Sequence, residues 1–413
     1  MTALAFVSVA GCWGDDGYAG SGSGGAGATG ANGGTGGDGS GGTGSGGSTG
    51  GTGDGTGTAG SAAGAGGSAA GNGGSIGGSA AGSIGGSAAG SSGGSGPVTR
   101  QPWPSSDAVV VVDSMGQFPE NLSDLVYQPA ASGGAAVLWA IQNDPSVLYC
   151  LLWNGTTWNA MTEDNWTYGK MLRYPSGNGS PDSEGVTRAE WSSTAIYVAA
   201  ERDNSAGSVS RMSVLRYDLA ATGGTLTATH EWNLTPDLPT AAPNVGIEAV
   251  TWVPDTYLIT NGLWDESTNA AYDPSRYPGH GTGLFFVGLE MNGMIYGYAL
   301  EHDTGAFTRI TSMASGLTSV MGLAFDRDQG NLWAYCDNTC TNEAAVLRVS
   351  AGQLALRYLF DHPATLPNSN HEGAAIAPES ECASGRKSFF WSDDDDFGGH
   401  AIYRGSIPCG TLP

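Results

Sequence analysis

Apolar and polar positions along residues 120–395 follow a pattern in which two kinds of apolar run recur in a fixed order. The first kind begins with a turn-forming or acidic residue and a small residue, and it continues as a short apolar run. Its copies lie at 120–127, 183–187, 246–252, 320–325 and 371–376. The second kind is an apolar run that ends on a polar or acidic residue. Its copies lie at 137–143, 195–201, 284–290, 332–337 and 388–393. Short apolar runs bounded by turn residues predict β-strands.

The spacing of these strands predicts an all-β fold. A repeated unit of about 50–75 residues, rich in strands and turns, is typical of a β-propeller. Five copies predict five blades. Six blades are the alternative if a decayed copy lies in the long third unit, which carries the insertion Asp265–Gly283. In the second unit, Ile196–Ala200, Ser213–Asp218 and Thr225–Trp232 are predicted to be successive strands. Long apolar patterns of helical period are missing, so little helix is expected.

A valine-rich run before the first repeat, Ala108–Val112, has no repeat partners of its own. The last repeat supplies only three strands, at 373–377, 388–392 and 401–407. A propeller closes its ring when a strand from one terminus completes the blade at the other, which removes the open edges of a linear array. We therefore predict that Ala108–Val112 is the outer strand of the last blade.

Composition separates a tail from a folded part. Residues 13–96 are almost entirely Gly, Ser, Ala and Thr, and such a stretch has too little apolar surface to offset its ordering entropy. We expect a disordered low-complexity linker with a root-mean-square reach of about 50 Å. Residues 97–413 are long enough to bury a sizeable core and are predicted to form the propeller domain.

Residues 1–12 form an apolar run that ends in Val9, Ala10, Gly11 and Cys12. This end resembles the lipobox of bacterial signal peptides, in which the cysteine is lipidated and becomes the mature N-terminus. The departures are that no Lys or Arg precedes the run and that the run is short. Trp13 stands where Asp would mark inner-membrane retention, which by resemblance to enterobacterial lipoproteins implies the outer membrane. We expect an exported protein, lipid-anchored at the outer membrane or cell surface of a bacterium, with no transmembrane helix. A chance cysteine after an apolar start is the alternative.

The chain carries a formal net charge of −24, and all but four of its 39 acidic residues lie within 97–413. A nucleic acid partner requires basic contacts to phosphate, so we expect none. An acidic excess fits either solubility outside the cell or the attraction of cations.

Four of the six cysteines lie in the last two repeats and predict two disulfides. Cys336 and Cys340 could close a tight loop at the end of a strand, while Cys382 and Cys409 could fasten the C-terminal part. The alternative, a metal site at Cys336 and Cys340, lacks a second Cys or His pair. An exported location permits disulfides.

Glu184, Glu248 and Glu372 occupy the same position of the first run, and Asn121 and Met321 occupy it in the other two copies. The first strand of each propeller blade lines the central channel, so these carboxylates are expected to converge at its mouth. The ends of the second runs add Asn143, Glu201, Glu290, Asp337 and Asp393. Converging like charges repel unless a cation neutralises them or some carboxyl groups are protonated, and oxygen-only clusters suit Ca²⁺ or Mg²⁺. We predict a divalent-cation site on the axis. The alternative is that these acids accept hydrogen bonds from the backbones of neighbouring blades.

Two further features could contribute to this site. Asp393–Asp396 is a run of four acids that resembles a calcium loop in composition only. It makes Asp393 and Asp394 candidate ligands, and a solvated turn is the alternative. His371 and His400 lie in the same repeat and could serve, with a carboxylate and a cation, in acid–base hydrolysis. Structural roles are the alternative for both histidines.

The segments Ser-Glu-Gly-Val-Thr, Gly-Ile-Glu-Ala-Val-Thr-Trp, Met-Gly-Leu-Ala-Phe-Asp and Asn-His-Glu-Gly-Ala-Ala-Ile resemble the phytase-like β-propeller superfamily, over about residues 107–409. The resemblance implies clusters of Ca²⁺ that hold phosphate together with basic residues. This chain differs in having only two lysines, Lys170 and Lys387, and little positive charge on the repeat face beyond Arg202 and Arg188. We therefore predict a protein that binds a small-molecule ligand or a protein partner on its acidic face. A calcium-dependent phosphoesterase is the alternative.

Overall fold

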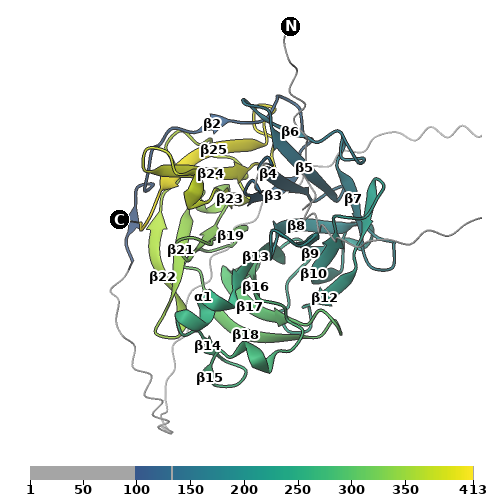
Figure 1. Ribbon diagram of the computed structural model, residues 1–413, viewed down its shortest axis with the longest axis vertical. Coiled ribbons are helices and arrows are strands. Elements are labelled where there is room, and N and C mark those ends of the chain that lie inside the picture. Colours follow the sequence, from purple (N-terminus) through teal and green to yellow (C-terminus); the bar gives the residue numbers. More distant parts are fainter. Residues whose placement is uncertain (1–97, 132–133, 413) are drawn as a thin grey trace, which may run out of the picture. The chain divides into compact units, whose positions relative to one another are not determined.

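The computed structural model describes residues 98–131 and 134–412. Within them, five sheets surround a central channel as the blades of a β-propeller (Figure 1). The innermost strand of each blade contacts the innermost strands of both neighbouring blades, so the ring is closed. These strands are β3 (Leu122–Gln128), β8 (Pro181–Thr187), β13 (Ile247–Pro254), β19 (Gly322–Asp326) and β23 (Ala374–Ile376). The prediction of five blades is confirmed, and the alternative of six is wrong.

Each blade continues outwards through hydrogen-bonded strands. Blade one adds β4 (Val137–Gln142), β5 (Val147–Trp153), β6 (Trp158–Ala160), β7 (Lys170–Arg173) and β11 (Thr225–Thr227). Blade two adds β9 (Ala195–Asp203), β10 (Ser210–Asp218) and β12 (His230–Asn233). Blade three adds β16 (Gly283–Leu289), β17 (Met294–Leu300) and β18 (Phe307–Ala314). Blade four adds β20 (Asn331–Tyr335), β21 (Ala344–Ser350), β22 (Gln353–Phe360) and β1 (Arg100–Gln101). Blade five adds β24 (Arg386–Ser392), β25 (Ile402–Pro408) and β2 (Val110–Val111).

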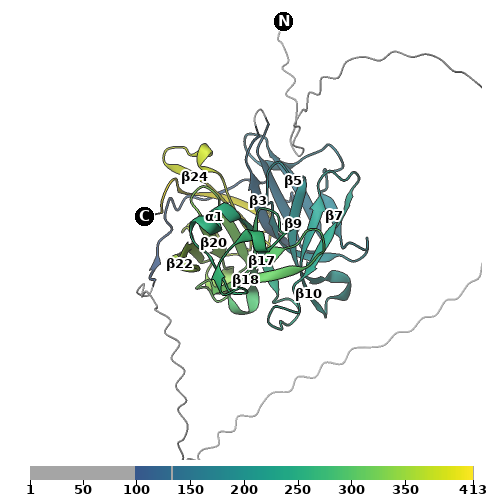
Figure 2. The same ribbon diagram turned by 60° about the horizontal axis from the view of Figure 1, so that its bottom comes forward.

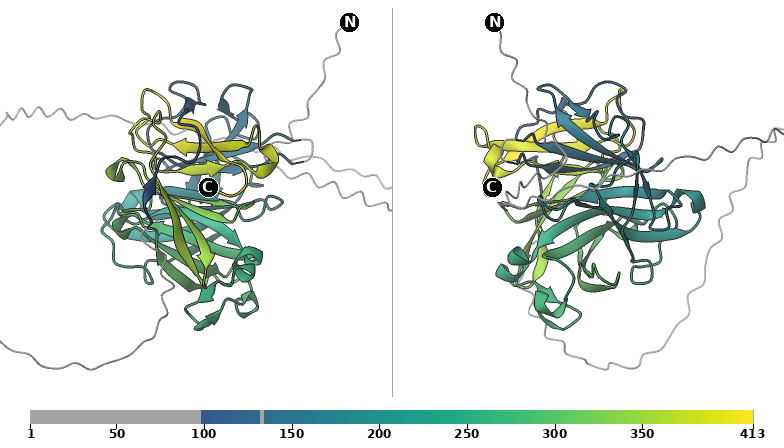
Figure 3. Two further views of the ribbon diagram at one scale, coloured as in Figure 1. Left: turned by 90° about the vertical axis from the view of Figure 1, so that its left-hand side faces the viewer. Right: turned by 45° about the vertical axis from the view of Figure 1, so that its right-hand side comes forward.

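The N-terminal segment closes the ring as predicted. Strand β2 pairs antiparallel with β25 and is the outer strand of blade five. Of the predicted run, Val110 and Val111 form the strand, and Val112 N adds a hydrogen bond of 3.0 Å to Ile402 O. Strand β1 was not predicted, and it pairs in parallel with β22 on the outer side of blade four (Figure 3). Between the two strands, Trp103 is buried against Trp333 and Trp391 and donates its indole N–H to Ser406 O at 2.9 Å. The segment therefore joins blades four and five.

The predicted single strand Thr225–Trp232 is wrong in one respect, because it is two strands in two blades. Strand β11 pairs in parallel with β7 of blade one, whereas β12 pairs antiparallel with β10 of blade two. Leu226 packs into the apolar cluster between blades one and two, and Trp232 packs into the cluster between blades two and three. The chain divides here because its two apolar residues are buried at different blade interfaces.

The core consists of apolar clusters between neighbouring blades, one at each of the five interfaces of the described ring. Strand β4 shows why its apolar run is continuous. Val137, Trp139 and Ile141 face blade two, while Leu138 and Ala140 face blade five. Side chains alternate between the two faces of a strand, so a strand covered on both faces needs an apolar residue at every position.

The small residue of the repeat is required because the inner strands meet at backbone contact distance. A Cβ atom at Gly185 would lie 2.6 Å from Val250 N of the next blade, and one at Gly373 would lie 2.4 Å from Asp124 Cα. A Cβ atom at Gly322 would lie 2.3 Å from Glu372 O. The glycine that follows the aligned position thus permits close packing of the blades around the channel.

Replacement of Gly185 by alanine is expected to lower the free energy of unfolding by about 2–4 kcal/mol, because the opposing atoms are backbone and cannot rotate away. Gly224→Ala is the matched control, since Gly224 has open space around it and no left-handed φ. Urea unfolding of both variants checks the prediction. Equal stability of Gly185→Ala and the control would contradict it.

The insertion Asp265–Gly283 in the third unit adds no blade. The connection between β13 and β16 that includes it contains helix α1 (Asp255–Thr260) and the hairpin β14 (Trp264–Asp265) and β15 (Ala270–Ala271). Helix α1 lies between blades three and four (Figures 1 and 2). Its residue Leu258 packs into the apolar cluster of these two blades, and Trp264 N donates to Gly352 O at 2.6 Å. The connection between β13 and β16 therefore covers the outer junction of these two blades.

Short 3₁₀ turns and two disulfides complete the described fold. The turns are η1 (Asn204–Ala206), η2 (Pro274–Arg276), η3 (Glu290–Asn292), η4 (Asn338–Cys340) and η5 (Glu379–Glu381). The disulfides Cys336–Cys340 and Cys382–Cys409 are confirmed. Among the described residues, no helix has the length and hydropathy needed to cross a bilayer.

Candidate metal centre

A cavity of about 420 Å³ lies at the mouth of the channel, where the inner strands begin. All five aligned positions of the first run line it, as predicted, and they alternate with residues from the ends of the second strands. Among the described residues, nine carboxylates, five asparagine amides, one arginine and one methionine line the cavity. The carboxylates belong to Asp144, Asp182, Glu184, Glu201, Glu248, Glu290, Asp337, Glu372 and Asp394.

The second runs contribute to the cavity in each blade, with one change of residue. Asn143, Glu201, Glu290 and Asp337 line it, but Asp393 does not. The carboxylate of Asp393 is fully buried and accepts hydrogen bonds from Ser369 Oγ at 2.8 Å and Phe397 N at 3.2 Å. Its neighbour Asp394 turns into the cavity instead, so one of the two predicted aspartates lies in the candidate site.

The two candidate acid–base histidines do not line this cavity. His371 is fully buried, and its ring nitrogens lie 3.2 Å from Ser392 O and 3.0 Å from Pro367 O. His400 Nδ1 lies 3.3 Å from a carboxylate oxygen of Asp113. The geometry therefore gives both histidines structural partners and brings neither to the carboxylates.

Asp182 and Asp144 were not among the predicted site residues. Asp182 stands two positions before Glu184 in β8, and alternate residues of a strand lie on one face, so the signal was an acid-x-acid spacing. Asp144 follows the end of β4 in the turn to β5. Asp394 stands at the corresponding position of blade five, whereas blades two, three and four have Arg202, Met291 and Asn338 there, so only one repeat partner marks Asp144.

Three carboxylates lie close enough to share an ion. Oxygen atoms of Asp182, Glu184 and Glu201 all lie within 4.8 Å of one another. Two oxygens bound to one Ca²⁺ at about 2.3–2.6 Å are at most roughly 5 Å apart. Beyond the effect of burial, the charges of Asp182 and Glu201 raise the pKa of Glu184, and the charges of Glu184 and Glu201 raise the pKa of Glu248. Such crowding favours a shared proton or a cation between the groups.

Burial and crowding raise the acid pKa values throughout the cavity. Burial is the main cause that raises the pKa of Glu184, Glu248 and Glu372 well above the usual range, and neighbouring carboxylates raise it further. Burial, with the charges of Glu201 and Asp337, raises the pKa of Glu290 to about 7. Burial raises the pKa of Asp394 to about 6. A bound cation would relieve this repulsion.

Two acidic residues accept hydrogen bonds from the backbones of neighbouring blades, which was the alternative role for these acids. They are Glu201, which lines the cavity, and Asp124, which does not. Glu201 accepts from Gly246 N of the next blade at 2.9 Å. Asp124 accepts from Val186 N at 2.8 Å and from Ala374 N at 3.2 Å. In the described structure, by contrast, no backbone amide donates to Glu184, Glu248 or Glu372. Glu184 accepts only from the Asn143 amide, at 3.3 Å, and Glu372 only from the Asn370 amide, at 2.9 Å. The three aligned glutamates therefore keep oxygens directed into the cavity.

Arg202 is the single basic residue among the described residues that line the cavity. Its Nε lies 2.6 Å from a carboxylate oxygen of Asp182, and its second guanidinium nitrogen lies 3.2 Å from Glu201. One guanidinium cannot neutralise nine carboxylates, so the cavity favours the binding of further positive charge.

Comparison with known proteins yields little beyond this geometry. No family model matches the chain, and no curated protein matches it. The solved structure described as "Crystal Structure of Mitotic Checkpoint Complex" aligns with 76% of this chain and 95% of its own chain, at 10% sequence identity and a TM-score of 0.34. A likeness at that level carries no argument about function.

Proposed function

We propose that the axial cavity binds a divalent cation, Ca²⁺ in the first place, and that the cation holds an oxygen-rich ligand or partner on this face of the propeller. The observation that carries the proposal is the set of buried glutamates without backbone donors, Glu184, Glu248 and Glu372, in a cavity with one arginine. Burying carboxylates without a counter-charge is costly, and a divalent cation removes that cost.

Asp182, Glu184 and Glu201 would hold the ion, since their oxygens already lie within 4.8 Å of one another. Ca²⁺ takes about six to eight oxygen ligands, and three carboxylates supply at most about six, and fewer where they bind through one oxygen. Positions remain for water or for oxygens of a ligand. The surrounding amides, such as Asn143 and Asn370, can donate hydrogen bonds to that ligand.

Binding is favoured over the phosphoesterase alternative for two reasons. Arg202 is already paired with Asp182 and Glu201, so it offers phosphate little free positive charge. The candidate histidines His371 and His400 have their own partners outside the cavity. A hydrolase would need several cations to reverse the charge of this site, and its turnover of phosphoesters would be abolished by chelation.

The predicted setting completes the proposal. Cys12 and the linker 13–96 lie outside the described residues, and the lipid anchor at the bacterial cell surface remains a prediction from the sequence. Anchored in this way, the cavity would present its cation to ligands outside the cell. The disulfides found in blades four and five suit an oxidising compartment.

Calorimetric titration of the full-length chain with Ca²⁺ tests the function. We expect saturable binding that Glu184→Gln weakens at least about tenfold, because a charge-assisted contact contributes roughly 1.5–3 kcal/mol. Glu248→Gln should weaken it less, since Glu248 lies beside the three closest carboxylates. Glu163→Gln is the matched control, because Glu163 is exposed and lies outside the cavity. Absence of binding heat, or equal affinity of all three variants, would reject the proposed site.

A further inference from the structure

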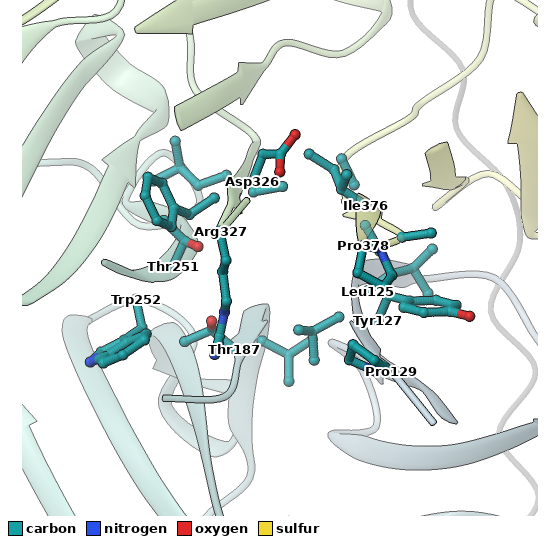
Figure 4. Close-up of a pocket in the computed structure, with 18 of the residues that line it drawn as sticks. Leu125, Tyr127, Pro129, Thr187, Thr251, Trp252, Asp326, Arg327, Ile376 and Pro378 are labelled. Atoms are coloured by element: carbon teal, nitrogen blue, oxygen red, sulfur yellow. The ribbon is translucent and has the colours of Figure 1, made fainter. Parts of the chain in front are cut away.

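A second cavity lies at the opposite ends of the inner strands. It has a volume of about 120 Å³ and is lined by the last residues of β3, β8, β13, β19 and β23 together with the turns that follow them (Figure 4). It shares no lining residue with the acidic cavity. All five blades therefore contribute to a site whose lining differs sharply from that of the acidic mouth.

One wall of this cavity presents a fixed guanidinium. Arg327 follows β19 and donates to Ala189 O at 2.8 Å and to Arg188 O, both in blade two. Its guanidinium carbon lies 4.0 Å from the ring centre of Trp191 and 4.9 Å from that of Trp252. These contacts use two of the five N–H groups of an arginine. No carboxylate among the described residues forms an ion pair with Arg327, and burial lowers its pKa only to about 10, so it stays charged at neutral pH.

Two threonine hydroxyls lie on the same wall. Thr187 and Thr251 are each 4% exposed, and in the described structure neither side chain has a hydrogen-bond partner. Figure 4 shows Arg327 running between Thr251 and Thr187, with Trp252 beside it. Buried polar groups are ordinarily hydrogen-bonded. Two unpartnered hydroxyls beside an unpaired guanidinium therefore form a set of donors that faces the cavity.

The opposite wall is apolar. Leu125, Pro129, Ile376 and Pro378 lie across the cavity from Arg327 (Figure 4). The ring of Tyr127 joins them, and its hydroxyl is used by a hydrogen bond of 2.6 Å to Glu381. This wall offers contacts to hydrocarbon and no charge.

The two acidic residues at the rim, Asp326 and Asp328, have their own partners and do not neutralise the charge of Arg327. Asp326 lies 2.7 Å from the fully buried ammonium of Lys387. Asp328 accepts a hydrogen bond of 2.7 Å from Glu379 N. The unmatched charge inside the cavity is that of Arg327.

From this arrangement we propose that the second cavity binds a small carboxylate with an apolar body. Its carboxylate accepts from Arg327, Thr187 and Thr251, and its hydrocarbon part packs on Leu125 and Ile376. Guanidinium and carboxylate match in geometry as well as charge. A cavity of about 150 Å³ holds one benzene molecule, so a cavity of about 120 Å³ takes a hydrocarbon part no larger than a benzene ring or a short alkyl chain. The carboxylate of benzoate or hexanoate then lies toward the opening.

Titration of the full-length chain with benzoate, benzamide and hexanoate, followed by calorimetry and ligand-observed NMR, tests this proposal. We expect benzoate or hexanoate to bind at least about tenfold more tightly than benzamide, because the amide lacks the negative charge. Equal binding of benzoate and benzamide would overturn the proposal. So would the absence of binding for both carboxylates at millimolar concentration.

Variants then locate the site. Arg327→Gln should weaken carboxylate binding about ten- to hundredfold. Arg309→Gln is the matched control, since Arg309 also faces an aromatic ring, that of Tyr296, but lies outside the cavity. Arg327 also links blades, so Thr187→Val provides a second variant of unchanged shape, with an expected loss of about three- to tenfold. Unchanged affinity in Thr187→Val and Arg327→Gln would overturn the assignment. Glu184→Gln should leave benzoate affinity unchanged, which separates failure here from failure of the cation site.

Discussion

In the presence of a chelator, the protein is expected to lose stability as pH rises from 6 to 8. Burial raises the pKa of Glu290 to about 7 and that of Asp394 to about 6, above the values of the unfolded chain. The folded state therefore holds protons that the unfolded chain has already released. This contribution to stability is present at low pH and disappears as pH rises through the folded-state pKa values. For these two groups the expected loss between pH 6 and 8 is on the order of 1 kcal/mol, because Glu290 is only half buried and solvent screens part of its interactions. The other raised glutamates add to it.

Saturating Ca²⁺ should reverse this behaviour. An ion bound only by the folded state adds roughly 2.7 kcal/mol when its concentration is a hundred times its dissociation constant. The free energy of unfolding, measured by urea denaturation at pH 6, 7 and 8, should thus fall with pH in chelator and hold or rise in Ca²⁺. His302 does not confuse the comparison, because burial lowers its pKa to about 4 and leaves it neutral throughout.

The variant Glu290→Gln is the control for this prediction. It removes the group whose pKa lies in the middle of the tested range, so its stability in chelator should depend less on pH. A chelator profile that rises with pH in the parent protein would show that the carboxylates are not crowded in the way the cavity indicates.

Replacement of Asp124 by alanine is expected to be the most damaging single change, with a loss of about 2–5 kcal/mol. Asp124 in blade one is fully buried and accepts hydrogen bonds from Val186 N of blade two and Ala374 N of blade five. Its removal leaves two buried amides without acceptors, and each such group costs about 1–3 kcal/mol. Because the two amides belong to the blades on either side of blade one, the substitution weakens the contacts that close the ring.

Asp124→Asn tests the same contact more gently. The asparagine oxygen can accept from one amide, but its nitrogen faces the other, so about half of the loss is expected. Urea midpoints at unchanged slope measure both effects, and Glu163→Ala, at an exposed position, should stay within about 0.5 kcal/mol of the parent. If Asp124→Ala unfolds at the same midpoint as Glu163→Ala, the contact does not hold the blades together.

Much of the fold could be predicted because every blade packs in the same way and so repeats the same sequence pattern. Continuous runs such as Val137–Gln142 mark strands buried on both faces, and the residue pair Glu-Gly marks a strand that meets its neighbour backbone to backbone. Strand β1 could not be predicted in this way, since Arg100 and Gln101 carry no apolar pattern and are placed by Trp103. The division of Thr225–Trp232 between two blades depends on contacts far away in the sequence.

The residues of the candidate site that occupy equivalent positions in the repeat could be predicted from the sequence. Aligned positions identify Glu184, Glu248 and Glu372 because equivalent residues of a ring converge on its axis. Asp394 took the place of Asp393 because Asp393 caps the turn that follows, where it accepts hydrogen bonds from Asp395 N and Phe397 N. Arg327 has no repeat partner, and only the folded chain shows that Trp191 and Trp252 from other blades hold it over a cavity.

The attachment of the N-terminal segment has a mechanical consequence. A pull on the chain before residue 98 would first load the two-residue pairing of β1 with β22 and then the anchored indole of Trp103. The closing strand β2 lies beyond both points, so it is shielded until they yield. Tension on the leading chain would therefore be absorbed at the junction of blades four and five, and the ring would stay shut while its attachment gives way.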